Sequence, residues 1–130
     1  MLGLSMSLSV GAAVVTVVSS KSPVVALSKS QIADIFLGRS YRYPDGAPAT
    51  PIDQPEASSL REQFYNTVAG ETLALVKAHW SKIIFTGRGQ PPKIVGSGAE
   101  LKKLLAANPL AIGYIDSADV DASVRVVDSR

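Results

Sequence analysis

The sequence lacks cysteine altogether and contains a single histidine, His79. Without cysteine there can be no disulfide, no thiolate nucleophile and no cysteine-based metal site. One histidine also leaves too few nitrogen ligands for an ordinary zinc site, and the serine-hydrolase elbow G-x-S-x-G is missing. The dinucleotide fingerprint G-x-G-x-x-G after a strand and the Walker A sequence are missing as well. We therefore expect a protein that is not an enzyme and that uses no metal or cofactor.

Charge and apolar content are both moderate. The 13 basic residues exceed the 11 acidic ones by only two, and they are scattered singly along the chain. Such a weak excess does not predict a nucleic-acid partner. The apolar run at residues 11–18 is too short to span a membrane. A length of 130 residues with 46% hydrophobic residues predicts one globular domain with one core, which we place at residues 14–130.

Residues 1–13, MLGLSMSLSVGAA, are apolar and end in small residues. They are similar to the second half of a secretory signal with a cleavage point near Ala12 or Ala13, although no basic residue precedes the apolar run. A signal-peptide remnant, an N-terminal extension and an apolar strand all remain open interpretations. The signal interpretation favours a periplasmic or secreted location.

Strand and helix patterns alternate along the rest of the chain. Residues 13–18, AVVTVV, carry consecutive valines, which is typical of a strand buried on both faces. Residues 27–38 form a predicted helix that begins with a capping box between Ser28 and Gln31 and ends at Gly38. The alternation predicts an α/β domain in which helices flank a layered sheet. Further helices are predicted at 60–68, at 72–84 and after Ser97, and further strands at 111–115 and 124–127.

The helix predicted at 72–84 is amphipathic, with Leu73, Val76, Trp80 and Ile84 on the side expected to face the core. His79 lies in the middle of this helix, and we expect a surface or partly packed imidazole there.

The segment at residues 51–64, PIDQPEASSLREQF, joins a short extended run to the start of a helix. Ser58, Ser59 and Arg61 would bring hydroxyl and guanidinium donors to that point, where backbone N–H groups also favour an anion. This pattern predicts a small oxyanion site. The alternative is that Ser59 is only the N-cap of the helix and pairs with Glu62 three residues later.

Four segments resemble parts of the phosphate-binding proteins of ABC transporters. The run LSKSQIADIFLGRSYRYPDG is similar to the start of the second lobe of that family. PEASSLREQF falls at the position of its anion-binding loop, and FTGRGQPP and AIGYI are similar to a later loop and a later strand. Together they cover approximately residues 14–127 in the family's order and spacing. The chain thus resembles one lobe of a type 2 periplasmic binding protein.

The resemblance implies specific roles at the anion loop. Ser58 matches the family serine that holds phosphate, and Ser59 replaces a glycine. Gln54 stands where the family has a phosphate-contacting arginine, and Leu60 replaces a ligand-binding threonine. Losing that arginine removes a charge-assisted contact of about 1.5–3 kcal/mol. Arg61, one position after Leu60, would have to compensate.

We therefore predict a non-enzymatic, periplasmic or secreted solute-binding domain for a small oxyanion such as phosphate, held by Gln54, Ser58, Ser59 and Arg61. A single lobe supplies only half of a binding cleft, which limits affinity to about millimolar. An ABC transporter or a second protein chain would supply the opposite wall. The alternative hypothesis keeps the fold but makes the domain a protein-interaction or structural module without a small-molecule ligand.

Overall fold

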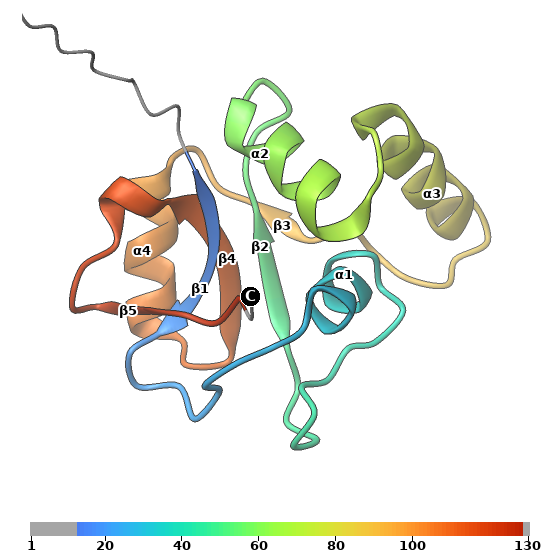
Figure 1. Cartoon of the computed structure of the whole chain (residues 1–130). Coiled ribbons are helices and arrows are strands. Elements are labelled where there is room, and N and C mark those ends of the chain that lie inside the picture. Colours follow the sequence, from blue (N-terminus) through green and yellow to red (C-terminus); the bar gives the residue numbers. More distant parts are fainter. Residues whose placement is uncertain (1–12, 129–130) are drawn as a thin grey trace, which may run out of the picture.

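The computed structural model describes residues 13–128, so all of the predicted signal remnant except Ala13 lies outside the described residues. A five-stranded sheet occupies the centre of the domain (Figure 1). Its strands are β1 (Val14–Ser19), β2 (Thr50–Asp53), β3 (Lys93–Ile94), β4 (Ala111–Asp116) and β5 (Val124–Val126). Their spatial order is β3-β2-β4-β1-β5. β1 is antiparallel to β4 and β5, whereas β2 is parallel to β3 and β4.

Helices cover both faces of the sheet, which confirms the predicted α/β layering. The helix α4 packs on one face, and α1 and α2 lie on the other (Figure 1). The helical segments are α1 (Lys29–Phe36), α2 (Ser59–Phe64), the π-helix η1 (Tyr65–Ala69), α3 (Leu73–Phe85), α4 (Gly98–Ala107) and the short 3-10 helix η2 (Ser117–Asp119).

Two of the local sequence patterns are confirmed in detail. The neighbouring residues Val17 and Val18 of β1 are both fully buried, because they face separate hydrophobic clusters on opposite sides of the sheet. The capping box of α1 is complete: the Ser28 hydroxyl accepts from the Gln31 backbone N–H, and the Gln31 side chain accepts from the Ser28 N–H. The consecutive valines and the capping pair therefore specified these elements locally.

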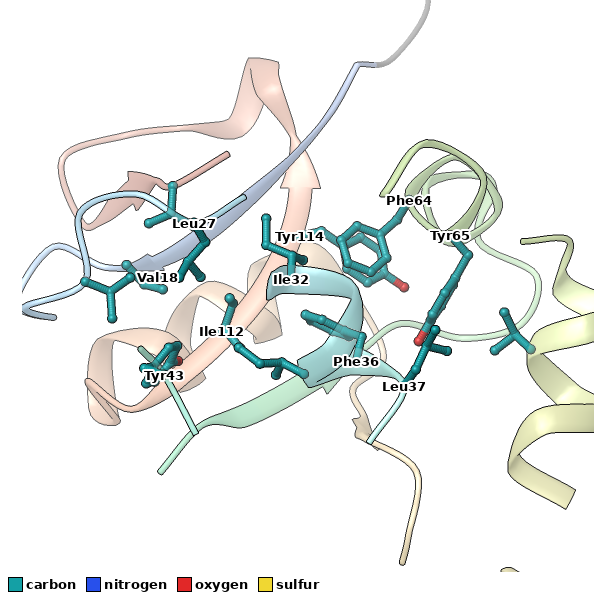
Figure 2. Close-up of a cluster of buried hydrophobic side chains, with 14 of the residues drawn as sticks. Val18, Leu27, Ile32, Phe36, Leu37, Tyr43, Phe64, Tyr65, Ile112 and Tyr114 are labelled. Atoms are coloured by element: carbon teal, nitrogen blue, oxygen red, sulfur yellow. The ribbon is translucent and has the colours of Figure 1, made fainter. Parts of the chain in front are cut away.

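The larger cluster is aromatic at the point where α2 meets β4. The Phe64 ring stacks on Tyr114 with ring centroids 4.2 Å apart, and the Phe36 ring meets Phe64 edge-on at 4.7 Å (Figure 2). On the other face, α4 approaches β4 closely because Gly113 has no side chain. A Cβ added at Gly113 would lie 2.7 Å from Leu101 Cδ1. These contacts fix α2 and α4 against the central strand.

The helix predictions for residues 60–84 need correction. The helix predicted at 60–68 is α2 followed directly by η1, from Ser59 to Ala69, and Gly70 ends it with a φ of 65°. The prediction that Ile84 faces the core is wrong, since this residue is 53% exposed. α3 lies at the margin of the domain, beside η1 and away from the centre of the sheet (Figure 1).

Candidate functional site

Two of the predicted site residues contact each other where β2 ends and α2 begins. Gln54 is only 4% exposed, and its Nε2 donates to the Tyr114 backbone carbonyl at 2.6 Å. The Ser58 hydroxyl donates to Gln54 Oε1 at 3.0 Å. The Gln54 amide is therefore engaged on both sides, and its role here is to hold the Ser58 hydroxyl in place.

The capping alternative for the serines is wrong in its details, because α2 begins one residue earlier than expected. Ser58, not Ser59, occupies the N-cap position, and it makes no side-chain capping hydrogen bond. Ser59 is the first helical residue, and its exposed side chain contacts no other described residue through a hydrogen bond. The Ser59 hydroxyl is thus open to solvent.

Arg61 is held on one edge of its guanidinium group. Its Nε lies 3.3 Å from Asp53 Oδ1, close enough for an ion pair, although the N–H points too far aside for a hydrogen bond. The guanidinium also lies over the Tyr65 ring, with Cζ 5.3 Å from the ring centroid. The terminal nitrogens Nη1 and Nη2 make no hydrogen bond with any described residue. Arg61 therefore presents two unused donors from a fixed position.

The carboxylate that holds Arg61 was not anticipated from the sequence. Asp53 is 2% exposed and accepts hydrogen bonds from the Tyr65 hydroxyl at 2.7 Å, from the Tyr114 hydroxyl, and from the Gln54 backbone N–H at 2.8 Å. The pKa values of both tyrosines lie well above the ordinary value of 10.0. Burial is the larger cause of this rise, and the negative charge of Asp53 is the second. A buried aspartate at the end of a strand needs hydrogen-bond partners of this kind. The position of Asp53 directly after the apolar residues of β2 was the sequence signal that could have identified it.

A groove of about 360 Å³ opens beside Arg61, between α3 and the edge of the sheet. Glu56, Arg61 and Lys77 are the charged residues along it, and neither Glu56 nor Lys77 forms an ion pair within the described part of the chain. We call this the α3 groove. Its apolar wall consists of Leu73, Val76, Trp80, Ile84, Pro91 and Ile94.

Other chemistries find little support among residues 13–128. No group of three His, Cys, Asp or Glu side chains within this range is arranged to hold a metal ion. His79 is partly packed, as expected, with Nε2 2.6 Å from the Leu37 carbonyl oxygen. Within the same range, no helix has both the length and the apolar character that crossing a bilayer requires.

Comparison with solved structures identifies the fold. The domain superposes with a TM-score of 0.70 and 24% identity on a protein from Clostridium perfringens described as a phosphate ABC transporter substrate-binding protein and solved with bound phosphate. It also matches an ABC-type phosphate transport receptor from Vibrio cholerae (TM-score 0.68, 20% identity) and PstS from Borrelia burgdorferi (TM-score 0.67, 14% identity).

These matches cover 88–90% of this chain but only 43%, 44% and 47% of the respective neighbours. No protein-family model and no curated protein sequence matches the chain. At these identities the likeness establishes the fold alone. The described domain has the fold of a partial lobe of phosphate-type substrate-binding proteins, over less than half of their length.

Proposed function

We propose that the chain is a non-enzymatic solute-binding domain that engages a small, phosphate-like oxyanion at Arg61, with Ser58, Ser59 and Gln54 beside it. The observation that carries this proposal is the guanidinium of Arg61. Asp53 and Tyr65 fix its position, while Nη1 and Nη2 have no partner among the described residues. Such a preorganised pair of donors suits bidentate recognition of an oxyanion. The fold likeness to phosphate-binding neighbours supports the same function.

The other residues have distinct proposed roles. The exposed Ser59 hydroxyl supplies a further donor to the anion. The Ser58 hydroxyl is a positioning group and not a donor to the anion, because its proton is already donated to Gln54 Oε1. Gln54 acts as a positioning residue, since its side chain is buried and engaged with Tyr114. Only Arg61 brings positive charge, so its loss should affect binding most.

A single lobe leaves the anion exposed on one side, so we expect an affinity of about millimolar for the isolated domain. A second chain or an ABC transporter would provide the opposite wall and raise that affinity. The fold likeness and the apolar residues 1–13 support a periplasmic or secreted location for this activity.

The test is a titration of the full chain with sodium phosphate and sodium sulfate. We expect backbone amide shifts at residues 57–62. At about 10 mM anion and a millimolar Kd, binding should stabilise the fold by about 1.4 kcal/mol, a Tm rise of about 4–6 °C. Arg61→Gln should abolish both effects. Arg39→Gln is the matched control, because that guanidinium touches only Asp34 at the surface, and it should leave both unchanged.

The rival hypothesis is a protein-interaction or structural module of the same fold. It is favoured by the internal engagement of Gln54, Ser58 and Arg61, each of which already has a partner in the chain. If neither anion shifts the amides at residues 57–62 nor raises the Tm, oxyanion binding is excluded and the module hypothesis is preferred.

A further inference from the structure

The charges around the α3 groove do not match a doubly charged anion such as inorganic phosphate. Arg61 and Lys77 contribute two positive charges, and Glu56 together with the buried Asp53 contributes two negative ones, so that the four sum to zero. A dianion placed there would remain largely unneutralised. A monoanion needs only the terminal nitrogens of Arg61 and, as a second positive charge along the same groove, the ammonium of Lys77.

The remainder of the groove is apolar, and two of its large hydrophobic side chains are exposed to solvent. Ile84 and Ile94 are 53% and 54% exposed, and both line the groove together with the nearly buried Trp80. The volume of about 360 Å³ falls within the range of small-molecule sites. An apolar ligand body seated there would cover side chains that the fold itself leaves in water.

We propose that the ligand of this domain is an organic monocarboxylate, with its carboxylate at Arg61 and Lys77 and its apolar body in the α3 groove against Trp80, Ile84 and Ile94. This inference rests on the Arg61 site of the proposed function, and it replaces phosphate with a larger carboxylate as the preferred oxyanion. The carboxylate accepts from the unused Nη1 and Nη2 donors of Arg61, and the body supplies most of the affinity. Inorganic phosphate then binds only weakly, because it cannot use the groove.

Trp80 makes the groove directly observable, because it is the only tryptophan of the chain. The experiment is a fluorescence titration of the full chain with acetate, butyrate and hexanoate, and with hexanamide as the uncharged match to hexanoate. Each buried methylene contributes about fourfold in affinity, so hexanoate, with two more methylenes, should bind about fifteenfold more tightly than butyrate. Hexanamide should bind at least tenfold more weakly than hexanoate.

Variants on the exposed side of α3 test the carboxylate contact and the apolar contact of the ligand separately. Ala74 lines the groove, and Ala74→Phe should weaken hexanoate at least tenfold while leaving phosphate within twofold; Ala78→Phe, on the same helix but outside the groove, should change neither. Lys77→Gln should weaken hexanoate about three- to fivefold, whereas Lys82→Gln should not.

The outcomes distinguish this inference from the proposed function. If phosphate binds through Arg61 but the affinity for carboxylates does not rise from acetate to hexanoate, the monocarboxylate proposal is wrong. A small oxyanion then remains the proposed ligand. If no probe binds, both are wrong. A further outcome is that the Trp80 emission wavelength shifts with protein concentration while no probe changes it. That result would mean that a second copy of the chain covers the groove, and it would also overturn the inference.

Discussion

Replacing Asp53 by asparagine perturbs the centre of the candidate site. The carboxylate accepts from Tyr65, Tyr114 and the Gln54 backbone and pairs with Arg61. Hydrogen bonds to a charged group contribute about 1.5–3 kcal/mol each, and asparagine keeps only one acceptor oxygen. The amide NH2 would face the Tyr65 hydroxyl, which has to turn and accept instead. We expect the free energy of unfolding to fall by about 2–4 kcal/mol, a large part of the total stability of an ordinary domain.

Urea unfolding followed by Trp80 fluorescence measures this loss. With an m-value of about 2 kcal/mol/M, the midpoint should fall by about 1–2 M. Asp119→Asn is the matched control, because this exposed aspartate makes no side-chain hydrogen bond or ion pair within the described residues, and it should change stability by less than about 0.5 kcal/mol. Equal midpoints for Asp53→Asn and the wild type would refute the argument that the buried cluster stabilises the fold.

The same substitution has a second consequence for binding. Asp53 repels any anion that approaches Arg61, and at about 7 Å with an effective dielectric constant of about 40 this repulsion is about 1.2 kcal/mol. Asp53→Asn should therefore bind phosphate about five- to tenfold more tightly, provided that the measurement is made where the variant is folded. Weaker binding would show instead that Arg61 needs the Asp53 carboxylate to hold its position.

Two further predictions concern stability. The phenols of Tyr65 and Tyr114 ionise near 10.0 in the unfolded chain, but their pKa values are raised in the folded one, so the unfolded state binds fewer protons above pH 10. The contribution of these two phenols should be constant between pH 8 and 10 and should fall above pH 10 by up to about 1.4 kcal/mol per pH unit for each tyrosine, as urea midpoints at pH 8–11 would show. Gly113→Ala should cost about 1–3 kcal/mol through its clash with Leu101, whereas Gly98→Ala, with open space around it on α4, should be neutral or stabilising by up to about 1 kcal/mol.

Elements with strong local signals were predictable from the sequence. Consecutive apolar residues defined β1, and the pair Ser28 and Gln31 defined the start of α1. The inward face assigned to α3 was correct at Val76 and Trp80 but wrong at Ile84. Helical periodicity says which side chains share a face, but it does not say how far the neighbouring sheet extends.

The strand-to-helix turn that carries Ser58 and Arg61 was predictable, but the bonding around it was not. The pattern around Ser58 and Arg61 indicated the turn between β2 and α2 correctly. Asp53 was missed because its tyrosine partners are 12 and 61 residues away in the sequence, so their contact depends on the packing of η1 and β4. The order of residues in one segment carries no information about such partners.

The internal carboxylate changes what the Arg61 guanidinium can recognise. An arginine without a partner would attract any small oxyanion, with little distinction between mono- and dianions. Here Asp53 offsets its charge and fixes its orientation, so the remaining selectivity has to come from the direction of Nη1 and Nη2 and from whatever lies beyond them. Arg61 is itself one of the residues that line the apolar α3 groove, so this groove lies beside the donor pair. A neutralised, oriented donor pair beside an open hydrophobic wall favours a ligand with one charge and a large body, and it disfavours a compact, highly charged one.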